Sequence, residues 1–155
     1  MKIGFGFDAH AFAPGRALLL GGVDVPHDAG LAGHSDGDAL AHAVIDALLG
    51  AAGLGDIGGM FPSTDERWRD ADSMELLRLA AVRVREAGHR VANVDATVVA
   101  QTPRIGPHAA AMRARLAAAL GAEEGAVNVK ATTTDGMGFT GRGEGIAAFA
   151  AALLE

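Results

Sequence analysis

Segments with helical periodicity alternate along this chain with short runs of apolar and β-branched residues. Capping residues, apolar spacing and a closing glycine predict helices over residues 37–52, 73–88 and 107–120. Period-2 alternation or β-branched runs predict strands over residues 2–8, 93–101 and 127–134. Because such helices can cover a sheet, the pattern predicts an α/β (α+β) fold in two layers.

Three other segments complete this layout. The run LLLGGVDVP predicts a strand pair that turns at Gly21 and Gly22. The last segment, GIAAFAAALLE, is ambiguous, because Ala and Leu favour a helix whereas a strand would better complete a two-layer sheet. Residues 54–72 have no periodicity and form a long connection, and such loops are often functional.

Length and composition indicate a single domain over residues 1–155. No Pro-, Gly- or Ser-rich linker divides the chain, and its hydrophobic fraction of 50% and charged fraction of 21% are typical of globular proteins. No apolar stretch reaches the roughly 18 residues of a membrane span. The N-terminal segment MKIGFGFDAH lacks the apolar core of a signal peptide. We therefore expect a cytoplasmic protein with no membrane partner.

Cysteine content and charge limit the chemistry. The chain has no cysteine, which excludes disulfides, thiolate nucleophiles and Cys-based zinc sites, so a metal must be held by His, Asp or Glu. The net charge of -6 argues against a nucleic-acid partner, because such binding relies on clustered Lys and Arg. A phosphorylated small molecule remains compatible, since a metal ion and a few backbone N–H groups can bind it locally.

One carboxylate and two histidines form a candidate metal site. Asp8 and His10 are two residues apart at the end of a predicted strand, so both point to the same side. His42 lies on the first predicted helix, with Asp38 and Asp46 four residues away along the same face. A helix folded back beside the strand would give one oxygen and two nitrogen ligands with a fourth position free, as in catalytic zinc sites. Asp38 or Asp46 would then orient His42 by accepting its other N–H.

The same residues also have an ordinary structural interpretation. Asp8 and His10 would simply end a strand, His42 would be a satisfied buried histidine, and Asp38 and Asp46 would solvate the helix. A D-x-H pair with a distant His is common in unrelated sequences. An Asp–His–His set also suits Mn²⁺ or Fe²⁺. Spacing alone does not decide between these interpretations.

Three polar loops are candidates for binding phosphate or a base. His34 and Ser35 stand at the start of the first predicted helix, where N–H groups attract anions, although an ordinary N-cap explains them equally well. Residues 130–145, KATTTDGMGFTGRGEG, suit phosphate and hard cations, or form a glycine-rich turn. Residues 100–106 can hold a base through backbone groups, or are only a loop. No Walker or Rossmann pattern supports a standard nucleotide site.

Six motifs are distributed along essentially the whole chain: GFDAHAF, LAGHSDGDALAHAVIDALLGAAGLGDIG, FPSTD, NVDATVVAQTPRI, PHAAAMR and VNVKATTTDGMGFTGRGEGIA. In this order and with nearly unbroken spacing, they resemble the 2-C-methyl-D-erythritol 2,4-cyclodiphosphate synthase family. Each motif is a weak or moderate signal by itself, but chance agreement of all six is very improbable.

The resemblance implies a reaction and the residues that carry it. In the non-mevalonate isoprenoid precursor pathway, 4-diphosphocytidyl-2-C-methyl-D-erythritol 2-phosphate is cyclised, its 2-phosphate attacking the β-phosphorus while CMP leaves. The family's ligands for one Zn²⁺ per subunit match Asp8, His10 and His42. His34 and Thr133 match positions that stabilise the transition state. Such transfers depend chiefly on positioning and on neutralising charge.

The resemblance also implies the substrate contacts. Ser35 would help to hold the phosphate end. The residues around the erythritol would be Asp56, Ile57 and Gly58, with Phe61, Pro62, Ser63, Thr64 and Asp65 in a mobile loop beside them. A neighbouring subunit would supply the cytosine pocket from Ala100, Gln101, Thr102, Pro103, Arg104, Ile105 and Gly106 together with Thr132, Thr133, Thr134 and Asp135.

A second cation and an assembly follow from the same resemblance. In the family, Mg²⁺ or Mn²⁺ bridges the α- and β-phosphates through a Glu, but Asp135 stands there in this chain, with the same oxygen ligand on a shorter side chain. The family forms homotrimers with active sites at the subunit interfaces. Each subunit has a mixed four-stranded sheet, with helices on one face and the other face toward the centre, which favours a strand for the C-terminal segment. Phe7, Phe139 and Arg142 match positions at or beside a central cavity that can take an isoprenoid diphosphate.

Two other functions are compatible with these residues. The first is a metal-dependent hydrolase that cleaves a nucleoside diphosphate with metal-bound water. The second is a non-catalytic trimer that binds an isoprenoid diphosphate through Arg142 and Phe7. Product analysis separates the first from a cyclase, and binding without turnover would identify the second.

Overall fold

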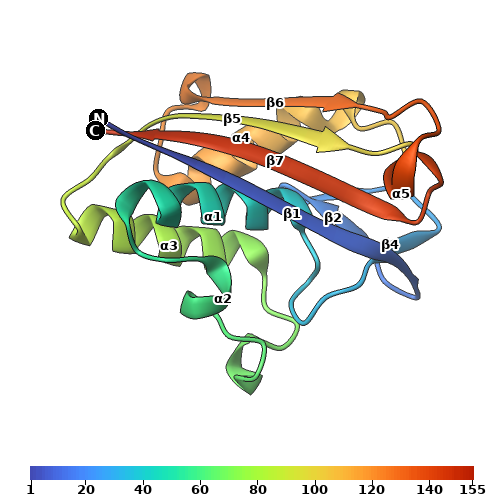
Figure 1. Cartoon of the computed structure of the whole chain (residues 1–155), viewed down its shortest axis with the longest axis horizontal. Coiled ribbons are helices and arrows are strands. Elements are labelled where there is room, and N and C mark those ends of the chain that lie inside the picture. The colour runs from blue at the N-terminus through green and yellow to red at the C-terminus, as the bar shows by residue number, and fades with distance from the viewer.

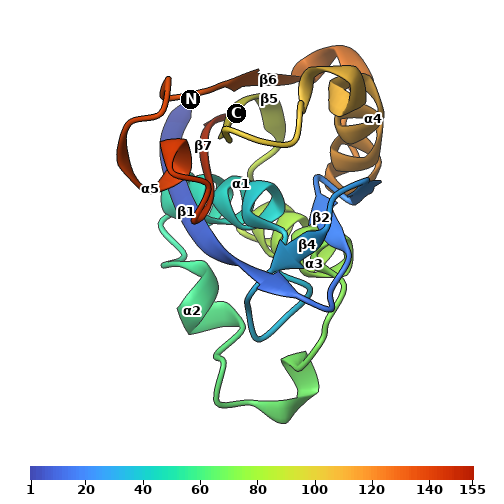
Figure 2. The ribbon, with the colours of Figure 1, turned by 90° about the vertical axis from the view of Figure 1, so that its right-hand side faces the viewer.

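The computed structural model describes residues 1–155 as a sheet with helices packed on one face (Figures 1 and 2). The helices are α1 (Ala39–Ala52), α2 (Ile57–Met60), α3 (Ser73–Glu86), α4 (Ala109–Leu120) and α5 (Gly138–Gly141). The strands are β1 (Lys2–Pro14), β2 (Leu18–Leu20), β3 (Val23–Val25), β4 (Ala29–Leu31), β5 (Val91–Val99), β6 (Val127–Thr132) and β7 (Gly145–Leu154). Short 3₁₀ turns lie at Glu66–Trp68, Gly106–His108 and Glu124–Ala126.

The main sheet is mixed, with the strand order β4-β1-β7-β5-β6. Only β5 and β6 run parallel, and the other neighbouring pairs are antiparallel. The predicted two-layer arrangement with a mixed sheet is confirmed. The sheet has five strands where four were expected, because β1 continues to Pro14 and its last residues pair with β4, from Phe12↔Leu31 to Pro14↔Ala29. The predicted turn at Gly21 and Gly22 joins β2 and β3 as a separate hairpin.

The ambiguous C-terminal segment forms β7, as the resemblance implied and against its helix propensity. The strand pairs with β1 on one side and with β5 on the other, so its backbone groups are satisfied within the sheet. Its buried positions are mostly alanines, which let α1 pack close to the sheet. Tertiary context therefore overrides local preference here.

Alternation along β1 separates two faces with different tasks. Gly4, Gly6, Asp8 and His10 share one side of the strand, as the period of two requires. A Cβ atom on Gly6 would lie 1.9 Å from the carbonyl oxygen of Ala43, and one on Gly4 would clash in the same way with α1. The two glycines therefore let α1 lie directly on β1, and Asp8 and His10 continue the same side toward the helix.

The other side of β1 is apolar and exposed. Ile3, Phe5 and Phe7 are 77%, 68% and 46% exposed, and Phe149 of β7 packs against both phenylalanines, with ring centroids 6.1 and 4.9 Å away. The main core lies between the sheet and the helices and contains 35 buried residues. An exposed cluster of large apolar side chains on a sheet indicates an interaction surface.

The helix boundaries explain where the polar loops lie. α1 begins at Ala39, with Asp38 as its N-cap, two residues later than predicted, because Gly37 has a φ of +77° that a continuing helix would not allow. His34 and Ser35 therefore precede the helix and are not in its first turn.

Residues 54–72 are only partly irregular, since they contain α2 and one 3₁₀ turn, and Figure 2 shows them projecting below the sheet. None of the helices is long and apolar enough to span a bilayer.

Candidate active site

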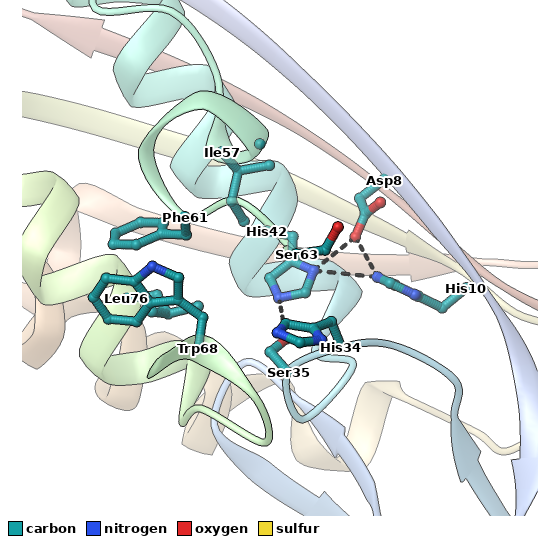
Figure 3. A pocket seen from close by; sticks show the side chains of 11 residues that line it. Asp8, His10, His34, Ser35, His42, Ile57, Phe61, Ser63, Trp68 and Leu76 are labelled. Carbon is teal, nitrogen blue, oxygen red and sulfur yellow. Dashed lines mark hydrogen bonds and ion pairs between the residues drawn. The ribbon is translucent and has the colours of Figure 1, made fainter. Parts of the chain in front are cut away.

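Asp8 and His10 of β1 meet His42 of α1 at one point (Figure 3). The Oδ2 atom of Asp8 lies 2.7 Å from Nε2 of His10 and 2.9 Å from Nδ1 of His42. These two ring nitrogens are 3.2 Å apart. The strand and the helix thus bring together the three side chains that the sequence pattern singled out.

This donor set fits a divalent metal. Metal–ligand distances of about 2.0–2.1 Å at tetrahedral angles separate neighbouring ligand atoms by about 3.3 Å. The separations between Asp8, His10 and His42, at 2.7, 2.9 and 3.2 Å, are all shorter than this value, so a bound ion would need the three side chains to move slightly apart. One oxygen and two nitrogens with lone pairs facing one another need a cation among them, either a metal ion or protons. An ion held by these three residues would face the pocket that they line, where a ligand could reach it.

The same contacts perturb the acid–base behaviour of the site. Burial alone would raise the pKa of the Asp8 carboxyl, but hydrogen bonds and charge from His10 and His42 outweigh it and lower the pKa well below its usual value. Burial would lower the pKa of His10, but the hydrogen bond and charge of Asp8 outweigh it and raise the pKa. The Asp8 carboxylate therefore stabilises a positive charge next to it, whether a protonated His10 or a metal ion.

The other ring nitrogen of His42 contacts two serines. Its Nε2 atom lies 3.1 Å from Oγ of Ser35 and 2.9 Å from Oγ of Ser73. The hydroxyl of Ser73 donates to Oδ1 of Asp36 at 2.5 Å. Asp36 and Ser73 were not singled out as site residues, and their positions 37 residues apart give no local sequence signal of this contact.

The sequence-based expectation for Asp38 and Asp46 needs correction. The carboxylate of Asp38 accepts N–H groups from Gly21, Gly22 and Ala41 at 2.8–3.0 Å, so it joins the β2–β3 turn to the start of α1. Asp46 accepts the N–H of Ile57 at 2.7 Å and so fixes the start of α2. Helical spacing put both on one face with His42, but nearby backbone donors bind their carboxylates. Their contacts are with the scaffold and not with the imidazole.

A pocket of about 260 Å³ is lined in part by Asp8, His10 and His42. Several predicted residues line it with them, namely His34, Ser35, Ile57, Gly58, Phe61 and Ser63. Trp68 and Leu76 also line it, which the sequence analysis missed. The ring of Trp68 meets that of Phe61 edge to face, with centroids 5.0 Å apart, so one wall is apolar. The pocket thus combines polar groups with an apolar wall.

The acidic residues of the 54–72 loop serve its local structure. Asp56 caps α2 by accepting the N–H of Gly59 at 2.7 Å. Asp65 caps the following 3₁₀ turn and pairs with Arg67 at 2.6 Å, and this hydrogen bond lowers the pKa of Asp65. The carbonyl of Asp65 lies 3.3 Å from Nε2 of His34. Pro62, Thr64 and both acids lie next to the pocket in sequence but do not line it.

Most of the residues predicted to hold the cytosine gather at a second pocket, of about 370 Å³, at the ends of β5 and β6, although Thr102, Thr134 and Asp135 do not line it. It is lined by Ala100, Gln101, Pro103, Arg104, Ile105, Gly106, Pro107, Ala131, Thr132 and Thr133. It shares no lining residue with the first pocket. Within one chain, the predicted cytosine residues are therefore separate from the predicted metal ligands.

The turn that follows β6 is exposed and held by local hydrogen bonds. Asp135 has a φ of +51°, a conformation that Asp adopts more readily than most residues, and its Oδ1 accepts the hydroxyl of Thr133 at 3.1 Å. The N–H of Gly136 donates to Oε1 of Gln101 at 3.2 Å, which joins this turn to the loop after β5. The hydroxyl of Thr134 bonds within the turn, at 2.5 Å from the carbonyl of Met137.

Comparison with known proteins places this fold and site in a family. The chain belongs to the YgbB family, whose match covers residues 1–155.

Individual relatives carry a more specific name. The chain is 61% identical over 154 residues to 2-C-methyl-D-erythritol 2,4-cyclodiphosphate synthase of Moorella thermoacetica, which covers 99% of this chain and 94% of that protein. It matches the structure of the bifunctional IspDF of Campylobacter jejuni with a TM-score of 0.95 and 48% identity, over 99% of this chain but only 42% of that one. A CDP-bound structure of 2C-methyl-D-erythritol-2,4-cyclodiphosphate synthase matches with a TM-score of 0.90 and 36% identity, over 99% and 100% of the two chains.

Proposed function

We propose that this chain converts 4-diphosphocytidyl-2-C-methyl-D-erythritol 2-phosphate to 2-C-methyl-D-erythritol 2,4-cyclodiphosphate with release of CMP. The observation that carries the proposal is the convergence of Asp8, His10 and His42 at the wall of a pocket that His34 and Ser35 also line. The name of the Moorella thermoacetica relative, which is similar over nearly its whole length, supports this reaction.

In the reaction, an oxygen of the 2-phosphate forms a bond to the β-phosphorus. The bond from that phosphorus to the oxygen bridging the α-phosphate breaks, and CMP leaves with the electron pair. Asp8, His10 and His42 would hold one Zn²⁺, which when bound withdraws charge from a phosphoryl oxygen. His34 would stabilise charge on the transferred group, and the hydroxyl of Ser35 would hold the phosphate end. Ile57 and Gly58 would contact the erythritol, beside the apolar wall formed by Phe61 and Trp68.

The second pocket would hold the cytosine. Its lining residues come from the loop after β5 and from the end of β6 and the turn that follows it. The CDP in the related structure supports a cytidine ligand. Thr133 would act on the phosphates from this side. Asp135, exposed beside Thr133, would bind Mg²⁺ or Mn²⁺ at the diphosphate, because hard cations prefer carboxylate oxygens.

The separation of the two pockets supports a homotrimer. Each complete site would join the metal pocket of one subunit to the cytosine pocket of its neighbour, so that the diphosphate crosses the interface. The exposed apolar face of β1 and β7, with Ile3, Phe5, Phe7 and Phe149, would then be covered at the centre of the assembly.

Product analysis tests the reaction. After incubation of the protein with the named substrate, Zn²⁺ and Mg²⁺, we expect phosphorus NMR to show a cyclic diphosphate and CMP in equal amounts. An open-chain bisphosphate would indicate a hydrolase and overturn the proposal. Binding of an isoprenoid diphosphate without turnover would indicate the non-catalytic alternative, in which the anion must compete with Glu144 for Arg142, since these side chains pair at 2.6 Å.

A further inference from the structure

Both nitrogens of the His42 imidazole have hydrogen-bond partners, so the ring is fixed in orientation. Nδ1 faces Asp8 and His10, whereas Nε2 faces the hydroxyls of Ser35 and Ser73. Ser73 is fully buried at the start of α3, and Ser35 is 8% exposed. Whether Nε2 carries a proton therefore depends on which way the hydroxyl protons of Ser35 and Ser73 point.

The position of Asp36 determines where the hydroxyl proton of Ser73 points. Its Oδ1 atom lies 2.5 Å from Oγ of Ser73 and its Oδ2 atom accepts the backbone N–H of Ser73 at 2.9 Å. An ionised carboxylate can only accept hydrogen bonds, so the single hydroxyl proton of Ser73 points to Asp36. The oxygen of Ser73 is then an acceptor toward His42, and the proton between them belongs to Nε2.

We infer that Ser73, oriented by Asp36, is a positioning residue that keeps His42 in the tautomer protonated at Nε2 and free at Nδ1. Nδ1 is the atom that faces Asp8 and His10, and a metal ligand must present an unprotonated nitrogen. Carboxylate partners of ligating histidines act in this way. Here the carboxylate of Asp36 does not contact the imidazole directly, and the hydroxyl of Ser73 on α3 connects it to His42 on α1. The inference deepens the proposed function and rests on its assignment of His42 as a metal ligand.

Asp36 is itself held in place, so this chain of hydrogen bonds is rigid. Its backbone N–H donates to the carbonyl of Ala71 at 3.1 Å, and its Oδ1 also accepts the N–H of Asp38 at 3.1 Å. Ser35, by contrast, has no hydrogen bond between its hydroxyl and the Asp36 carboxylate, and its Oγ atom lies 3.5 Å from the backbone nitrogen of Gly37. Its hydroxyl proton is therefore available to a molecule in the pocket. Ser73 thus orients His42, whereas Ser35 can donate to a ligand.

Zinc affinity and the tautomer of His42 test this inference without using catalysis. In zinc-loaded wild-type protein, we expect nitrogen-15 NMR to identify Nε2 as the protonated nitrogen of His42 and Nδ1 as the metal-bound one. In Ser73→Ala, the backbone hydrogen bond to Asp36 remains, but the side-chain acceptor is lost. We expect the dissociation constant for Zn²⁺, measured by chelator competition, to rise about 10- to 100-fold.

Asp72→Ala is the matched control, because Asp72 caps the same end of α3 through the N–H of Met74 at 2.8 Å and does not contact His42. We expect it to lower thermal stability with no change in zinc affinity. Equal zinc affinity in Ser73→Ala and wild type, equal losses in Ser73→Ala and Asp72→Ala, or a proton on Nδ1 in the wild-type protein would overturn the inference. If Ser73→Ala does not fold, the wild-type tautomer alone decides. Wild-type protein that binds no zinc would instead contradict the metal site of the proposed function.

Discussion

The two pockets of the chain differ in how the fold holds them. The proposed metal pocket is built where α1 packs on β1, and its proposed ligand His42 is only 7% exposed. The second pocket lies at the ends of β5 and β6, where its lining residues Gln101, Thr132 and Thr133 are exposed. Long-range packing therefore fixes the first pocket before any ligand arrives, whereas local hydrogen bonds shape the second and leave it open to a neighbouring molecule.

The largest effect is expected at the metal ligands. Asp8→Ala or His42→Ala should remove bound Zn²⁺ and lower the cyclisation rate about a thousandfold or more, because several kcal/mol of charge stabilisation are lost. Elemental analysis and product formation measure the two effects, and the sedimentation coefficient should stay that of the wild-type assembly. Full zinc occupancy in His42→Ala would refute this site.

A change in the scaffold beneath the metal pocket should have the next largest effect. In Gly6→Ala, the added Cβ would lie 1.9 Å from the carbonyl of Ala43, so α1 must move away from β1. We expect the free energy of unfolding to fall by about 1–3 kcal/mol, with weaker zinc binding.

Gly50→Ala is the control for that change, because Gly50 lies in α1 with nothing near the position of its Cβ. It should leave zinc binding unchanged and raise the free energy of unfolding by about 0.5–1 kcal/mol. Denaturant titration of both variants compares them, and similar stability of Gly6→Ala and wild type would contradict the close contact between α1 and β1.

Zinc binding should also depend on pH. Burial opposes the charged form of His10, but Asp8 outweighs it, so the raised pKa means that the metal-free ring keeps its proton to higher pH than an ordinary histidine. That proton competes with the metal, so zinc affinity should fall by at least about tenfold from about pH 8 to about pH 6. Chelator competition at both pH values measures it, and equal affinities would argue against His10 as a ligand.

The smallest effect is expected beside the second pocket, at Asp135. Asp135→Ala removes one exposed carboxylate, so the Mg²⁺ or Mn²⁺ concentration for half-maximal rate should rise about tenfold, while zinc content stays unchanged. An unaltered divalent-ion titration would remove Asp135 from the site. Asp135→Glu, which restores the residue expected from the family resemblance, tests whether the shorter side chain limits cation affinity.

The sequence correctly predicted that Asp8, His10 and His42 come together, because regular geometry determines their positions. A period of two put Asp8 and His10 on the same side of β1, and helical capping located the helix that carries His42. The partners of His42 were predicted wrongly, since spacing along α1 pointed to Asp38 and Asp46. Backbone N–H groups from the β2–β3 turn and from α2 bind those two carboxylates, and only the folded chain shows where these groups lie.

The C-terminal strand and the second pocket show a different limit. Local propensity favoured a helix for residues 145–154, and only the resemblance to a family indicated β7, because its pairing with β1 and β5 is a long-range property. The sequence did not predict Trp68 and Leu76 as lining residues for a similar reason, since only tertiary packing places such apolar side chains in the wall of a pocket. The trimer and the residue roles stay predictions.

A crystal structure with Zn²⁺, Mg²⁺ and a cytidine diphosphate bound would test the central claim most directly. The account predicts an ion held by Asp8, His10 and His42, and a cytosine in the pocket of residues 100–106 of the adjacent subunit, with the diphosphate between them. A zinc ion bound elsewhere, with His42 turned away from Asp8, or a nucleotide bound wholly within one subunit, would contradict it.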